Sequence, residues 1–326
     1  MASREGGSGS RQPVAEGSGK SRAKKKPVKS KKKPVKEKKK SSKPARSAGG
    51  SNGGEAQAAD AGNAKVVRRN RGDQEVRRLL ARPDIQGPRV KLGVLWFVAA
   101  VASVLLGRWT VLGLWSVAAA VAAWQVTKVW AGQPRASKLP GWGPAASAVT
   151  AVVCVAGAGL GTALGGIALM TAPLLLVIVV TVSGRKPAAA GAAVIGAVLA
   201  AIPAMSIVLV ARDEQWAALF LVVAVSFYDA GYFIGAAESS SRLEGPVTGA
   251  IGLLAVTFAA SAFEAQPFDR ATAWIVGAVM VLACPLGQML VSAELPAATS
   301  RAGAMRRLDA YLVSGPLMLA AVWAVT

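Results

Sequence analysis

The 326-residue chain contains no histidine and only two cysteines. Histidine is the commonest metal ligand and general base, so its absence excludes the usual zinc sites and histidine-based catalysis. Cys154 and Cys284 stand in separate apolar runs without a second cysteine nearby, which excludes zinc-ribbon and thioredoxin-like motifs. We expect both to be small buried apolar residues. Any catalysis must therefore use carboxylates, Lys or Arg, and oxygen-binding cations such as Mg²⁺.

Large apolar side chains are scarce near the N-terminus, where most of the positive charge is found. Residues 1–91 contain 26 Lys and Arg against 8 Asp and Glu, whereas residues 92–326 contain 12 against 9. A basic segment of low hydrophobicity cannot bury enough surface to offset its chain entropy, so we expect residues 1–72 to be a disordered tail. Residues 73–91 are expected to form a juxtamembrane segment, with a short helix over 73–82. No secretory signal is expected, because the first apolar run begins after residue 90.

Three interpretations of the basic tail stand beside one another. It could be a solvated segment that only holds the N-terminus on one side of a membrane. It could also bind anionic lipid, at about 1 kcal/mol per Lys or Arg close to the surface. Nucleic acid is the third candidate partner, although no aromatic residues are interleaved for base stacking.

The rest of the chain, residues 92–326, predicts an all-α polytopic membrane domain of about nine transmembrane helices. Charged and Gly/Pro clusters divide it into runs long enough to cross a bilayer. These runs are 92–107, 111–127, 145–163, 165–183, 188–211, 216–235, 246–263, 271–292 and 309–325. The boundary between the third and fourth is the least distinct.

The positive-inside rule predicts the orientation of these spans. With the N-terminus in the cytoplasm, nine Lys and Arg fall in the inner connections and three in the outer ones. This asymmetry predicts an integral protein of the cytoplasmic membrane with an external C-terminus. A second copy of the chain, forming a homodimer, is a further candidate partner.

Asp229 interrupts the apolar run at 216–235. A charged side chain within hydrocarbon costs at least about 2.5–3.5 kcal/mol, so such a residue normally faces a protein interior and marks a functional site. Alternatively, Asp229 is close enough to the end of the run to reach headgroup water. Both interpretations stand at this point.

Four elements in the C-terminal third share an order and a spacing. They are Asp229 to Gly235 at the end of one span, Glu244-Gly245 at the start of the next, Pro285 to Ser292 at the end of a third, and Leu308-Asp309 at the start of the last. Together they resemble the signature of the membrane-embedded phosphatidate cytidylyltransferase family, the CDP-diacylglycerol synthases. That family transfers a cytidylyl group from CTP to phosphatidate with Mg²⁺, so the resemblance implies CTP, phosphatidate and the phospholipid membrane as partners.

The resemblance also implies roles for individual residues. Asp229, Glu244 and Asp309 are the implied catalytic residues, and Asp229 and Asp309 would hold Mg²⁺. We expect the three carboxylates to converge at one cytoplasm-facing cavity, because isolated buried charges are costly. The candidate substrate-binding residues are Tyr232, Arg242, Arg306 and Arg307, since Arg binds phosphate in a bidentate manner.

The chain also departs from the family pattern. Gln288 and Val291 stand where the family has Asp and Glu, and Ser240 and Ser241 stand where it has basic residues. Three hypotheses therefore remain: a divergent cytidylyltransferase of phospholipid biosynthesis, a non-catalytic lipid-binding or scaffolding protein with the same fold, and a small transporter that uses Asp229 as an ion-coupling charge.

Overall fold

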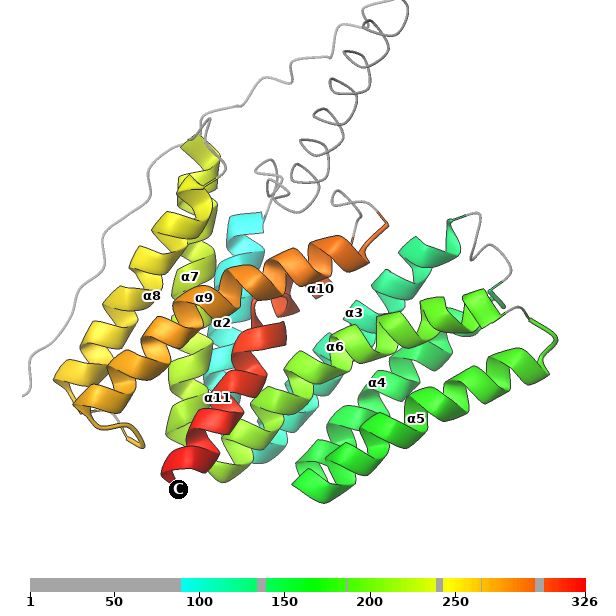
Figure 1. Cartoon of the computed structure of the whole chain (residues 1–326), viewed down its shortest axis with the longest axis horizontal. Helices are drawn as coiled ribbons and strands as arrows, with labels where there is room; N and C mark the ends of the chain where they lie inside the picture. The colour runs from blue at the N-terminus through cyan, green and yellow to red at the C-terminus, as the bar shows by residue number, and fades with distance from the viewer. Residues whose placement is uncertain (1–88, 134–138, 186, 239–242, 265, 297–301) are drawn as a thin grey trace, which may run out of the picture. The chain divides into compact units, whose positions relative to one another are not determined.

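The computed structural model describes residues 89–133, 139–185, 187–238, 243–264, 266–296 and 302–326, and the regular secondary structure within these ranges is helical (Figure 1). The tail predicted over residues 1–72 and residues 73–88 of the juxtamembrane segment lie outside the described residues. The helices are α2 Arg89–Leu105, α3 Arg108–Ala131, α4 Gly143–Leu160, α5 Thr162–Val182, α6 Pro187–Asp213, α7 Gln215–Glu238, α8 Glu244–Ala262, α9 Arg270–Glu294, α10 Met305–Leu308 and α11 Tyr311–Val325.

Each predicted apolar run corresponds to a helix, which confirms the predicted all-α membrane fold. In the described residues, eight helices are long and apolar enough to cross a membrane, and α10 and α11 together form the last of them. The first run contributes a shorter apolar helix, Lys91–Leu105, within α2. The third and fourth runs are separate helices, because α4 ends at Leu160 and α5 begins at Thr162.

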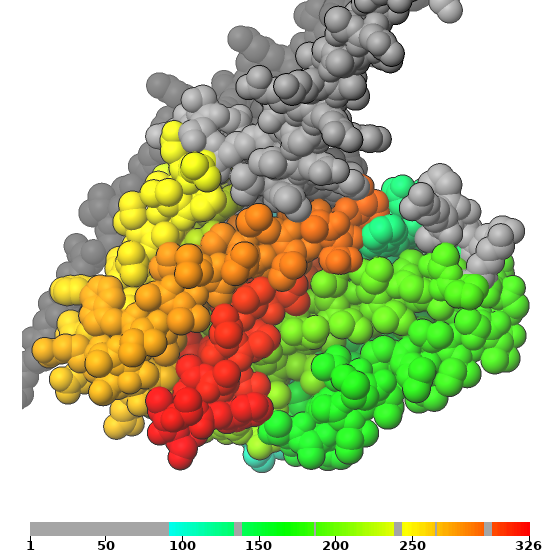
Figure 2. All heavy atoms as spheres, viewed as in Figure 1, coloured from blue at the N-terminus to red at the C-terminus, as the bar shows by residue number. Residues whose placement is uncertain are grey.

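Helix α6 is the central element of one part of the bundle, where it packs against α3, α4, α5 and α11. It is the most buried of the candidate spans, and its buried residues are mostly alanines. Small side chains let neighbouring helices approach closely, so an alanine-rich helix suits this position. Helix α11 contacts both α6 and α9, and it lies between them on the face seen in Figure 2.

Helices α7 and α8 form the most extensive helix pair, and glycines on both sides permit it. A side chain at Gly231 of α7 would collide with the carbonyl oxygen of Thr248, and one at Gly249 of α8 would lie 2.9 Å from the carbonyl oxygen of Tyr228. The Thr248 hydroxyl donates to the Gly231 carbonyl at 2.8 Å. Gly231, which belongs to the first sequence element, and Gly249 therefore serve close packing.

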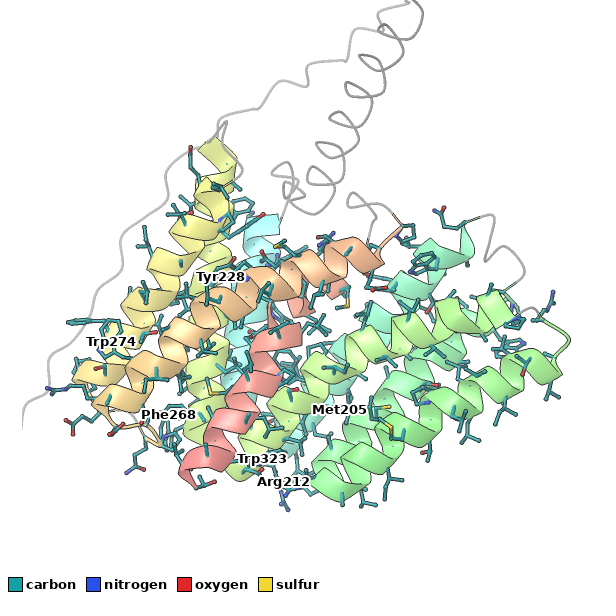
Figure 3. All side chains as sticks on the ribbon, in the orientation of Figure 1. Met205, Arg212, Tyr228, Phe268, Trp274 and Trp323 are labelled. Atoms are coloured by element: carbon teal, nitrogen blue, oxygen red, sulfur yellow. The ribbon has the colours of Figure 1, made fainter. Side chains whose placement is uncertain are left out.

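The end of the bundle opposite the start of α2 is fixed by polar contacts between helix ends. Gly107, with φ of 103°, makes the turn between α2 and α3, a conformation that favours glycine. Arg212 and Asp213 form an ion pair at 3.1 Å, and the Trp323 indole donates to Asp213 at 3.0 Å. Arg212 and Trp323 lie near one another in Figure 3. This end therefore ties α6 to α11.

Asp269 caps α9 at the same end by accepting a hydrogen bond from the Thr272 backbone N–H at 2.8 Å. Hydrogen bonds from the side chain and backbone of Thr272 lower the pKa of this exposed carboxyl. Asp269 is therefore ionised at neutral pH, which suits the positive end of the α9 dipole.

Candidate functional site

Asp229 is held inside the helical body by a partner on another helix. Its Oδ1 accepts a hydrogen bond of 3.3 Å from Nε2 of Gln288 on α9, and the contact is partly buried. The side chain thus turns towards α9. This favours the functional interpretation of Asp229 over one in which it reaches headgroup water alone.

Asp309 lies at the junction of α10 and α11 and is only 4% exposed. Its Oδ1 accepts a 2.8 Å hydrogen bond from the Ala310 N–H, and its Oδ2 is 3.5 Å from Nη1 of Arg306. Arg306 Nη1 also donates to the Ser292 hydroxyl at 2.8 Å. Arg306 therefore links the Asp309 carboxylate to α9.

The approach of Asp309 to α9 depends on Gly287. A side chain at Gly287 would collide with the Asp309 carbonyl oxygen and lie 3.4 Å from that of Ala310. Gly287 precedes Gln288, the partner of Asp229. The third and fourth sequence elements are thus packed against one another, and the third also contacts the first.

Two carboxylates and two guanidinium groups share this region. Asp229 interacts electrostatically with Asp309 and Arg307. Asp309 interacts electrostatically with Arg306 and Arg307. Two like charges in a poorly solvated site repel strongly, so the arginines offset much of their cost. The predicted residues Asp229, Asp309, Arg306 and Arg307 therefore form one group, called the charged site below.

Tyr232 borders the charged site from α7. It interacts electrostatically with Asp309, Arg306 and Asp229. Its ring centroid is 6.2 Å from that of Tyr228, whose buried hydroxyl has no hydrogen-bond partner in the described part of the chain. Tyr232 thus lies where the sequence predicted a substrate-binding residue.

Glu244 is not shown to converge with Asp229 and Asp309, so its place in the site stays a prediction. The described residues include no group of three Asp, Glu, Cys or His side chains that could hold a metal ion. Glu244 is exposed in the first turn of α8, whereas the next residue, Gly245, is buried beside Tyr232 and Ala236. Successive helical residues point about 100° apart, so Glu244 and Gly245 lie on different faces of α8. Arg242 lies outside the described residues.

Three polar residues of this region are not among the predicted site residues. In the sequence, Gln288 and Ser292 are only members of the Pro285 to Ser292 element, and Gln288 is also a departure from the family pattern. Their i, i+4 spacing places both on one face of α9, which was the available signal. Gln125 of α3 accepts a 2.9 Å hydrogen bond from the Ala304 N–H and so anchors the segment before α10.

The carboxylate oxygens of the charged site are suitable ligands for a hard cation such as Mg²⁺. Mg²⁺ is usually bound by one or two carboxylates, with water and phosphate oxygens completing its shell. Asp229 and Asp309 are such a pair, and the adjacent arginines suit the phosphates that would accompany the cation. The site therefore has the groups needed to bring a cation and a phosphate together.

Comparisons with known proteins do not assign the chain to a family. No protein-family model matches the chain, and no curated protein shows significant similarity to it. Its apolar helices identify the chain as a polytopic helical membrane protein with about eight spans.

Proposed function

We propose that the chain is a membrane-embedded, phosphatidate cytidylyltransferase-like protein of phospholipid biosynthesis. One observation supports this most: Asp229, Gln288 and Asp309, from three separate sequence elements, lie in one group with Arg306. These elements are the ones that carry the resemblance to the family.

In this function, an oxygen of the phosphatidate phosphate attacks the α-phosphorus of CTP. The bond to the β-phosphate breaks, which gives CDP-diacylglycerol and diphosphate. Arg306 and Arg307 would orient phosphate oxygens and offset the negative charge that spreads over the transferring group. Asp229 and Asp309 would hold Mg²⁺, which when bound neutralises phosphate charge and orients the leaving group.

The positive-inside asymmetry supports a matching location. It favours the cell membrane with the N-terminus in the cytoplasm, where CTP is found. The charged site would then open towards the cytoplasm, and the basic tail would lie beside anionic lipid headgroups.

The test is formation of CDP-diacylglycerol by purified protein given CTP, phosphatidate and Mg²⁺. Asp229→Asn and Asp309→Asn should each lower the rate by about 100-fold or more, because each removes a charge from the reacting centre. Asp269→Asn is the matched control, since Asn also caps helices well and Asp269 lies at the other end of α9. Unchanged product formation in both site variants would contradict the proposed roles.

A non-catalytic lipid-binding protein is the second candidate. The hydrogen bond from Gln288 to Asp229 favours it, because an amide occupies the place where the family has a second carboxylate. This candidate predicts that the native protein retains phosphatidate through purification but forms no CDP-diacylglycerol under any metal condition.

A further inference from the structure

An apolar groove lies beside the charged site. Its volume is about 230 Å³, and it is formed by α2, α3 and the segment that includes α10. Its lining residues are Trp96, Leu114, Val117, Ala118, Val121, Ala304 and Arg307. Val117 is 62% exposed and Val121 is 43% exposed, so the groove opens at the surface of the helical body.

The groove is unsuited to water. A bound water needs two to four polar partners, and six of the seven lining residues are apolar. Because α3 is a candidate span, the surface around Val117 faces hydrocarbon when the protein is in a bilayer. An acyl chain is the ligand that matches both the apolar wall and this location.

A charged group lies at one end of the groove. A Cβ at Gly93 of α2 would be 3.3 Å from Nη1 of Arg307, so the guanidinium runs alongside this glycine. Gly93 is one helical turn nearer the start of α2 than Trp96, which lines the groove. A guanidinium at the end of an apolar groove is complementary to a lipid. The guanidinium can bind the phosphate, and the groove can hold the hydrocarbon tail.

A stack of aromatic rings supports the wall of the groove. Trp96 packs edge-on against Trp115 with a centroid distance of 5.3 Å, and Trp115 packs in the same way against Tyr311 at 5.2 Å. Trp115 and Tyr311 are almost completely buried, and Tyr311 follows Asp309 by two residues. The groove wall is therefore packed, through these rings, against the segment that carries Asp309.

We propose that the α2–α3 groove binds one acyl chain of a phosphate-bearing membrane lipid, whose phosphate lies at Arg307. The lipid then enters sideways from the bilayer. This inference deepens the proposed function by locating its lipid substrate, and it rests on that function only for what becomes of the lipid after binding.

The test uses phosphatidate with a photoreactive group on one acyl chain, in phosphatidylcholine nanodiscs that contain the full chain. Irradiation should label the peptide that contains Leu114 to Val121. Val117→Trp fills the groove and should lower this labelling at least about tenfold, which corresponds to about 1.4 kcal/mol of binding free energy. Val149→Trp on α4 is the matched control, because Val149 is also 62% exposed, and labelling should be unchanged.

A second arm tests the phosphate. A diacylglycerol probe with the same photoreactive chain should label the groove about tenfold less than the phosphatidate probe, because it cannot bond Arg307 through phosphate. Arg307→Gln should abolish this preference. Comparable melting temperatures for Val117→Trp and Val149→Trp would show that the former is folded.

The inference is overturned if Val117→Trp leaves labelling unchanged, or if Val149→Trp lowers it equally. Equal labelling by the two probes would also overturn it, since the phosphate would then have no role. These readouts require no turnover, so a protein that makes no CDP-diacylglycerol can still bind lipid in the groove.

Discussion

Replacing Arg306 by methionine should destabilise the protein more than any other single change considered. Removing one partner of a buried ion pair costs about 3–5 kcal/mol, because an uncompensated charge stays behind. Arg306 contacts both Asp309 and Ser292, and its loss would leave the almost completely buried Asp309 carboxylate without this partner. The measurement is thermal unfolding of purified protein in an uncharged detergent.

Two further variants separate this effect from a general loss of charge. Arg270 pairs with Glu264 at 3.6 Å, but both side chains are about two-thirds exposed, so Arg270→Met should change stability by less than about 1 kcal/mol. The double variant Arg306→Met/Asp309→Asn removes both charges and should recover much of the lost stability. The ion pair would have no structural role if Arg306→Met and Arg270→Met melted at the same temperature.

Gly287→Ala should be the next most harmful change, because the new methyl group would collide with the Asp309 carbonyl oxygen. Overpacking of this kind typically costs about 1–3 kcal/mol. The shift of Asp309 away from α9 should also impair any activity of the charged site. Thermal unfolding and CDP-diacylglycerol formation measure the two effects.

Gly191→Ala provides the matched control. Gly191 is also helical, but a Cβ there would meet nothing within 4 Å. Alanine is favoured over glycine within helices by about 1 kcal/mol, so this variant should be neutral or slightly stabilised. If both alanine variants behaved alike, the close contact between Gly287 and Asp309 would not be important.

The course of the helices could be predicted from the sequence because hydrocarbon imposes a strong constraint. Each span must be long, apolar and hydrogen-bonded within itself, so composition alone locates it. Even the short break between α4 and α5 was visible as a glycine-rich interruption. The buried, isolated state of both cysteines was predicted on the same grounds and is confirmed.

The charged site could be predicted only in part. An acidic residue in an apolar run is costly, so Asp229 stood out, and its protein partner agrees with that reasoning. The place of Glu244 relative to the site could not be predicted from the sequence, because the direction of its side chain depends on which face of α8 packs on α7. Gln288 and Gln125 were missed because a neutral amide is common on any helix, and only tertiary contacts identify its partner.

In the proposed function, Asp229 and Asp309 should act as a pair that holds a cation against phosphate. The most direct test is electron paramagnetic resonance of Mn²⁺, which takes the same oxygen ligands as Mg²⁺, with CTP present and the protein in uncharged detergent. The native chain and Asp269→Asn should show a protein-bound Mn²⁺ signal, and Asp229→Asn and Asp309→Asn should both lose it. A bound signal that persists in either site variant would contradict the account, because the two carboxylates would then not share one cation.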